Sequence, residues 1–172
     1  MASFVEGLSK ILLNTGSITK EDAQIYVQEF EKSSKESFDD FLLEEGLVDE
    51  QALLRALSSY YNVPATDVIG LFFDRELLTN IPEDVLTRNA MIPYELDGNI
   101  LIVIASNPSD PNLLPILGDY VSADIQFHVG LKRDILEVIR EFYEKSETEI
   151  DDEEENEEPE TLDDILDNDF TL

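Results

Sequence analysis

The chain repeats itself near its start: Leu12-Leu13-Asn14-Thr15-Gly16-Ser17-Ile18 returns 30 residues later as Leu42-Leu43-Glu44-Glu45-Gly46-Leu47-Val48. In both copies, apolar residues recur at helical spacing before and after the repeated stretch. Gly16 and Gly46 stand where a helix would end in the left-handed conformation. Such a repeat indicates two copies of one small unit, neither of which can bury its apolar face alone. We expect residues 1–64 to form a helical repeat subdomain.

Residues that typically begin helices follow both glycines. Thr19 and Asp49 have side chains suited to capping a helix N-terminus, and acidic residues follow each of them. The second helix of the first unit should bury a stripe made of Ala23, Val27 and Phe30. The chain should therefore enter four helices before residue 64, in two similar pairs.

The apolar period changes after residue 90. Residues 91–96 and 99–105 resemble strands, and Asp97-Gly98 between them is a strong hairpin signal. Pro93 indicates an edge strand or a bulge, because proline cannot donate a backbone hydrogen bond. Residues 125–129 alternate as a third strand, and 131–145 form an amphipathic helix. The sequence predicts an α+β fold, with an α/β subdomain at 65–145 after the helical one.

Composition excludes several classes of function. The net charge is −29, so the surface would repel the phosphates of nucleic acids and the anionic lipids of membranes. There is no Cys for a disulfide or a thiolate metal site. The longest strongly apolar run, residues 100–105, is too short to insert into a membrane, and the N-terminus has no signal-peptide pattern. We expect a cytoplasmic protein whose charge serves solubility, recognition of a protein partner with a basic or apolar groove, or both.

Several motifs occur in a fixed order. After the paired Leu-Leu-x-x-Gly units come Ala-Leu-Ser-Ser-Tyr-Tyr-Asn-Val-Pro at 56–64, Ile-Pro-Glu-Asp at 81–84 and Arg-Asp-Ile-x-x-x-Ile-x-x-Phe-Tyr at 133–143. This order resembles the N-terminal domain of the bacterial type II secretion and type IV pilus assembly ATPases, over roughly residues 1–145. The resemblance implies a helical subdomain packed against an α/β subdomain. No Gly-x-x-x-x-Gly-Lys-Ser/Thr phosphate loop is present. We therefore expect a stand-alone domain without the ATPase, and no enzyme.

One branch of this family binds cyclic di-GMP through two tandem copies of a motif. The motif begins Arg-Leu-Gly, continues Leu-Leu-x-x-Gly-Leu-Leu and ends in Gln. The resemblance places Gly7 and Ser37 at the arginine, Ser9 and Asp39 at the glycine after it, and Phe30 and Tyr60 at the final glutamine. Arginine stacks on guanine and pairs with phosphate, which neither glycine nor serine can do. The scaffold residues remain while these six positions, the degenerate motif positions, have changed.

We therefore predict a non-catalytic protein–protein interaction or adaptor domain that needs no cofactor and no metal. Its expected partner is a component of a secretion, pilus or motility machine. The alternative is a nucleotide sensor of the cyclic di-GMP type with altered ligand chemistry. Its positive charge would then come from Arg55, Arg88, Lys132 or Arg133. His128 lies in an alternating strand without an evident catalytic partner, and we expect it to be structural or on the surface.

The C-terminal segment is acidic and regains apolar residues at its tip. Residues 147–172 contain no Lys or Arg, and we expect disorder over 146–172, because such a sequence buries too little apolar surface to fold alone. Apolar residues nevertheless recur at helical spacing in Leu162, Ile165, Leu166 and Phe170, with Leu172 at the end. We predict that this tip is a docking helix for the partner's groove. The alternative is a passive solubilising tail.

Overall fold

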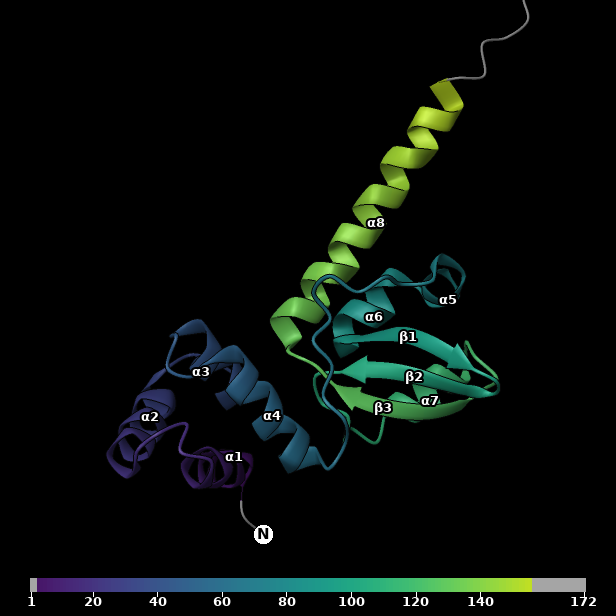
Figure 1. The fold of residues 1–172 in the computed structure, drawn as a ribbon. Helices are drawn as coiled ribbons and strands as arrows, with labels where there is room; N and C mark the ends of the chain where they lie inside the picture. Colours follow the sequence, from purple (N-terminus) through teal and green to yellow (C-terminus); the bar gives the residue numbers. More distant parts are fainter. Residues whose placement is uncertain (1–2, 156–172) are drawn as a thin grey trace, which may run out of the picture. The chain divides into compact units, whose positions relative to one another are not determined.

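A computed structural model describes residues 3–155, with side chains described over 3–148 (Figure 1). The chain divides into two units, residues 1–139 and 140–172. The first unit contains the helical repeat, a three-stranded sheet and the start of the last helix. The α+β class predicted from the sequence is thereby confirmed.

The helical repeat forms as its sequence predicts. Its helices are α1 (Phe4–Asn14), α2 (Lys20–Lys32), α3 (Phe38–Glu44) and α4 (Glu50–Tyr61). Gly16 and Gly46 have φ of +71° and +65°. The backbone N–H of Ser17 donates to the Leu12 carbonyl at 2.9 Å, and that of Leu47 donates to the Leu42 carbonyl at 3.0 Å. The two units therefore end α1 and α3 with the same left-handed closure.

The predicted caps begin α2 and α4. The hydroxyl of Thr19 accepts from the backbone N–H of Asp22, whose carboxylate accepts from the N–H of Thr19, both at 3.1 Å. Asp49 accepts from the backbone N–H of Ala52 at 3.1 Å. These bonds satisfy amide groups that have no partner within the first helical turn.

The core of the repeat lies mainly between α1, α3 and α4. Leu12 and Leu42, which are equivalent in the two copies, are both fully buried. The stripe predicted for α2 is only half-buried and packs against this core. The main contacts of α2 among the described helices are with α1 and α3, and much of its apolar face stays partly open. Burial of each leucine side chain contributes about 1.5–3 kcal/mol.

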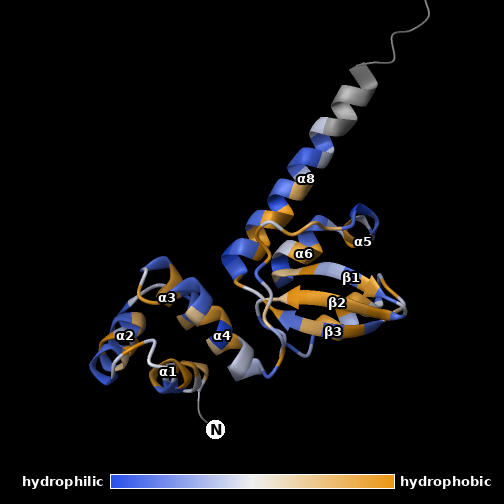
Figure 2. Ribbon diagram, in the orientation of Figure 1, coloured by the Kyte–Doolittle hydropathy of each residue, from blue (hydrophilic) through white to orange (hydrophobic). Residues whose placement is uncertain are grey.

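The second half of the unit is built on a sheet of order β1-β2-β3. Its elements are α5 (Arg75–Thr79), α6 (Glu83–Asn89), β1 (Met91–Asp97), β2 (Ile100–Ala105), α7 (Leu113–Gly118) and β3 (Asp124–Val129). β1 and β2 form the predicted hairpin, with Gly98 at φ +59°, and the register shifts between Pro93 and Glu95 as the proline indicated. β2 runs parallel to β3. Figure 2 shows β2, the central strand, as hydrophobic throughout.

Backbone pairing joins the helical repeat to the sheet. The N–H of Val129 donates to the Pro64 carbonyl, and the N–H of Thr66 donates to the Val129 carbonyl, both at 2.9 Å. Val129 and Leu131 belong to the same buried cluster as the repeat's leucines. Arg133 also donates to Glu50 at the start of α4, at 2.7 Å. These contacts hold the end of β3 and the start of the last helix beside α4.

The last helix, α8, runs from Lys132 to Glu155. The sequence predicts an end near Lys145, and the described helix continues to Glu155. Glutamate favours helix, and extending an existing helix costs far less than starting one. Residues 156–172, including the predicted docking positions Leu162, Ile165, Leu166, Phe170 and Leu172, lie outside the described residues. No helix within the described part of the chain is long and apolar enough to cross a membrane.

Candidate functional site

Two of the degenerate motif positions pack against each other. Gly7 in α1 lies under the ring of Tyr60 near the end of α4, and a β-carbon added to Gly7 would stand 2.7 Å from Tyr60 Cε2. Side-chain carbons essentially never approach so closely. The sequence resemblance predicts that Gly7 stands at the arginine position of the first copy and Tyr60 at the glutamine position of the second. The tyrosine ring has therefore taken space that a longer side chain at position 7 would need.

Phe30, which the resemblance predicts at the glutamine position of the first copy, packs in an aromatic cluster. Its ring centroid lies 5.3 Å from that of Phe38 and 5.6 Å from that of Phe41. Phe38 and Phe41 are buried core residues of α3. Phe30 thus contributes to packing between α2 and α3, in a geometry that favours aromatic pairs.

Ser37 and Asp39 begin α3. Ser37 is the N-cap residue, but its hydroxyl donates to the carboxylate of Asp39 and makes no capping bond to the helix. Asp39 is only 8% exposed. Ser9, the remaining degenerate position, has a buried hydroxyl without a hydrogen-bond partner among the described residues.

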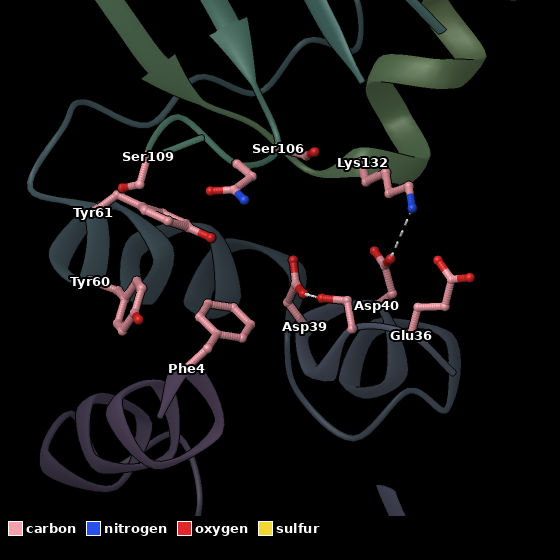
Figure 3. Close-up of a pocket in the computed structure, with 11 residues that line it drawn as sticks. Phe4, Glu36, Asp39, Asp40, Tyr60, Tyr61, Ser106, Ser109 and Lys132 are labelled. Atoms are coloured by element: carbon pink, nitrogen blue, oxygen red, sulfur yellow. Dashed lines mark hydrogen bonds and ion pairs between the residues drawn. The ribbon is translucent and has the colours of Figure 1, made fainter. Parts of the chain in front are cut away.

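A pocket of about 520 Å³ opens beside these residues (Figure 3). One wall is aromatic and consists of Phe4 from α1 with Tyr60 and Tyr61 from α4. The centroid of the Tyr60 ring lies 5.0 Å from that of Phe4 and 4.9 Å from that of Tyr61, both edge-to-face. The three rings therefore form a connected apolar surface, with the tyrosine hydroxyls as its polar groups.

The facing wall is acidic and comes from the start of α3. Glu36, Asp39 and Asp40 line it together with Ser37 (Figure 3). Burial raises the pKa of the Asp40 carboxyl above its ordinary value of 3.8, and the neighbouring charge of Asp39 raises it further. Burial, followed by the charge of Asp39, also raises the pKa of the Tyr61 hydroxyl. Negative charge is therefore concentrated on this wall, and Tyr61 is uncharged at neutral pH.

The third side of the pocket comes from the sheet half of the unit. Ser106, Asn107 and Ser109 follow β2, and Lys132 opens α8. The Nζ of Lys132 lies 3.8 Å from Asp40 Oδ2. Lys132 is the single basic residue among those that line the pocket, against three carboxylates in the same lining.

Residues 61–149 match the MshEN domain family. The chain is an MshEN domain protein. Its fold resembles a solved structure of MshE with cdg, at a TM-score of 0.64 and 18% identity over 79% of this chain and 98% of that one. It also resembles the N-terminal domain of XpsE, at a TM-score of 0.58 and 18% identity over 81% of this chain and 96% of that one. No curated protein matches the sequence.

The family recognised from sequence motifs is thus confirmed, and three of the six positions predicted to be degenerate in this MshEN protein line one pocket. These are Ser37, Asp39 and Tyr60, while Gly7 supports Tyr60 from below. Ser9 and Phe30 are not among the lining residues. Sequence reasoning missed Phe4, Tyr61 and Asp40. The adjacent pairs Tyr60-Tyr61 and Asp39-Asp40 were the signals available, because tyrosine joins an apolar ring to a polar hydroxyl and paired carboxylates concentrate charge.

The cations suggested for an altered nucleotide site are mostly elsewhere. Arg88 pairs with Asp84 on α6 at 3.1 Å, and Arg133 pairs with Glu50 and Asp134. Arg55 is exposed on α4 and is not among the lining residues. Lys132 alone of the four reaches the pocket.

His128 donates to or accepts from the hydroxyl of Thr66, with Nδ1 and Oγ1 2.9 Å apart. Burial lowers the pKa of the imidazole below its ordinary value of 6.5. His128 is half-buried in β3 and bridges this strand to the segment that follows α4. This geometry agrees with the expectation that His128 is structural or on the surface.

Proposed function

We propose that this MshEN domain is a non-catalytic adaptor that works through protein contacts within a secretion, pilus or related machine. We propose also that it does not use cyclic di-GMP. The observation that carries the proposal is the contact between Gly7 and Tyr60, where a β-carbon on Gly7 would stand 2.7 Å from the tyrosine ring. By the predicted motif register, this ring lies where the side chain of a motif arginine would begin. The solved MshE structure contains cdg. In this chain the corresponding motif ends serve packing and an acidic wall.

Electrostatics support the same proposal. Cyclic di-GMP is a dianion, and a site for it needs cationic or amide donors near its phosphates. The pocket beside the motif residues has three carboxylates and one lysine, which already lies near Asp40. Like charges placed together in a partly buried site cost free energy. A nucleotide would therefore meet repulsion where the family motif would supply attraction.

An exposed apolar surface supports a role in protein binding. Phe72, in the connector before α5, is 96% exposed, and Leu96 at the end of β1 is 48% exposed. Both border a second hollow of about 610 Å³, which Leu77 and Tyr94 also line. Apolar residues that are exposed together mark interaction surfaces, and aromatic side chains often anchor protein contacts.

The rival function is a nucleotide sensor that uses Lys132 as its phosphate contact. This alternative requires Lys132 to leave Asp40 and a dianion to approach Asp39, which no described cation neutralises. The adaptor proposal requires neither step.

Titration calorimetry with cyclic di-GMP tests the nucleotide part of the proposal. We expect no dissociation constant tighter than about 10 micromolar, which corresponds to roughly 7 kcal/mol. The MshE domain, whose solved structure contains cdg, is the positive control. Tight binding that Lys132→Ala abolishes would establish the sensor and overturn the proposal.

Affinity capture tests the adaptor part. The full chain, Phe72→Ser and the matched surface variant Thr87→Ser are immobilised and exposed to extract of the source cell. We expect one or more proteins to bind the chain and Thr87→Ser but not Phe72→Ser, since Phe72 is the exposed anchor. If all three immobilised proteins retain the same partners, Phe72 is not part of the interface. Retention of none by the unmodified chain would argue against an adaptor.

A further inference from the structure

We propose that the pocket lined by Phe4, Tyr60, Tyr61, Asp39 and Asp40 receives an arginine side chain of a partner protein. The guanidinium would lie against the aromatic wall and pair with the carboxylates opposite. The inference rests on the proposed adaptor function and names the chemistry of one of its contacts. At the degenerate motif positions, the pocket would then bind a cation, whereas a nucleotide site would bind an anion.

The first support is a buried carboxylate without a counter-charge. Asp39 is 8% exposed and lines the pocket. It accepts a hydrogen bond from the neutral hydroxyl of Ser37. No ion pair among the described side chains includes Asp39. A buried carboxylate normally has a cationic or multiple hydrogen-bonding partner, because desolvation of its charge is costly. A cation that enters the pocket would supply that partner.

The second support is the neighbouring carboxylate. Asp40 follows Asp39 in α3 and also lines the pocket, and Lys132 reaches it only at 3.8 Å. The charge of Asp39 raises the pKa of Asp40, after the larger effect of burial. An entering cation interacts favourably with both carboxylates and offsets their mutual repulsion.

The third support is the aromatic wall that faces these carboxylates. Figure 3 shows Phe4, Tyr60 and Tyr61 on one side of the hollow and Asp39 and Asp40 on the other. A cation between them gains from ring faces and from charge together. Arginine fits this combination better than lysine, because its planar guanidinium stacks on aromatic rings and pairs with carboxylates in a fixed fork.

The pocket's size and rim fit a side chain presented by a peptide. A volume of about 520 Å³ exceeds the space of a guanidinium alone, so part of the flanking main chain can enter as well. Ser106, Asn107 and Ser109 line the sheet side with groups that can bond peptide N–H and C=O. The surrounding protein carries a net charge of −29, which favours approach of a basic partner.

Nuclear magnetic resonance titration of the full chain with N-acetyl-arginine amide tests the inference. We expect saturable shifts at the amides of residues 36–40 and 60–61, with a dissociation constant in roughly the millimolar range typical of so small a ligand. N-acetyl-citrulline amide has nearly the same shape without the charge and should not saturate. Equal binding of citrulline amide, or of N-acetyl-lysine amide, would overturn the assignment to arginine.

Charge-removing variants localise the binding. Asp39→Asn and Asp40→Asn should each weaken binding of N-acetyl-arginine amide by about tenfold, a size typical of losing one paired carboxylate. Asp84→Asn, an exposed acidic residue of α6 that pairs with Arg88, is the matched control and should bind unchanged. Asp40→Asn keeps the test valid if Asp39→Asn does not fold, because Asp40 is only half-buried. Unchanged binding in the folded variants would overturn the inference.

The outcomes separate the inference from the proposed function. If arginine amide does not bind while the chain still captures a partner through Phe72, only the arginine pocket is wrong. If cyclic di-GMP binds tightly and shifts the same amides, the proposed function is wrong. Capture of a partner together with arginine-dependent shifts supports both.

Discussion

Gly7 and Tyr60 fit together so closely that a β-carbon on Gly7 would stand 2.7 Å from the tyrosine ring. Gly7 lies inside α1, where glycine is normally a poor choice, since it costs about 1 kcal/mol relative to alanine. The close contact with Tyr60 explains why glycine occupies this helical position. It also couples α1 to the end of α4, and so fixes the aromatic wall of the pocket.

Gly7→Ala should therefore have opposite effects in two backgrounds. In the unmodified chain the added methyl group collides with Tyr60, and we expect a loss of about 1–2 kcal/mol in the free energy of unfolding. In the background of Tyr60→Ala the collision is absent, and the same substitution should stabilise by up to about 1 kcal/mol through helix propensity. Urea unfolding of the four proteins gives the coupling free energy. Equal effects in both backgrounds would show that Tyr60 does not restrict position 7.

The repeat predicts equal responses at Gly16 and Gly46. Both have positive φ, and nothing lies within 4 Å of a β-carbon built on either, so strain of the backbone is the only expected cost. Gly16→Ala and Gly46→Ala should each destabilise the protein by about 1–2 kcal/mol. Gly118→Ala is the matched control, because Gly118 has open space around it and no positive φ. In thermal unfolding, both repeat variants should have a lower midpoint temperature than the control. An unchanged midpoint for either glycine variant would contradict the shared left-handed closure.

His128 should make the stability depend on pH in a defined direction. Burial lowers the pKa of its imidazole below 6.5, so the folded state favours the neutral ring. Its contribution is present above pH 6.5 and is lost as the pH falls through the lowered folded pKa. His128→Gln keeps a hydrogen-bonding group near Thr66 without titrating. The difference in unfolding free energy between the two proteins should therefore shift against the histidine protein between pH 7.5 and about pH 5.

Asp40 has the opposite effect on stability. Because its pKa is raised in the folded state, its ionisation lowers the free energy of unfolding as the pH rises. It is present in both proteins of the histidine comparison and cancels in the difference. A difference that does not change with pH would show that His128 is as hydrated in the folded chain as in the unfolded one.

Local signals in the sequence predicted the elements, while contacts between distant residues produced the pocket. Gly16, Gly46 and Pro93 each indicate a local backbone geometry. The two glycines have the expected positive φ, and the strand register shifts next to the proline as expected. Phe4 and Tyr61 meet only because α1 packs on α4, with ring centroids 6.2 Å apart. No periodicity within either helix encodes that contact.

The sequence underestimates the length of α8 for a different reason. An acidic composition indicates disorder, but adding residues to a helix whose first turns are already packed is favourable.

The tip of the chain supplies the last prediction, which the sequence alone motivates because residues 156–172 lie outside the described part of the structure. A segment of residues 161–172 is too short to be a stable helix by itself in water. We expect it to fold on its partner and to bury Leu166 and Phe170. Replacement of both by alanine should weaken binding of the captured partner by roughly 2–5 kcal/mol, the range for apolar anchors in a groove. Asn168→Ala, off the apolar face, is the matched control and should bind normally.

Amide hydrogen exchange on the isolated protein decides whether that partner is another molecule. If the segment docks on another molecule, the amides of residues 161–172 should exchange fast without the partner and more slowly after the partner is added. Protection already present in the isolated chain would mean that the segment docks on its own domain. Leu166→Ala with Phe170→Ala would then strengthen partner binding, because the variant would uncover the surface on which the tip lies. The two mechanisms thus predict changes of opposite sign in the same binding measurement.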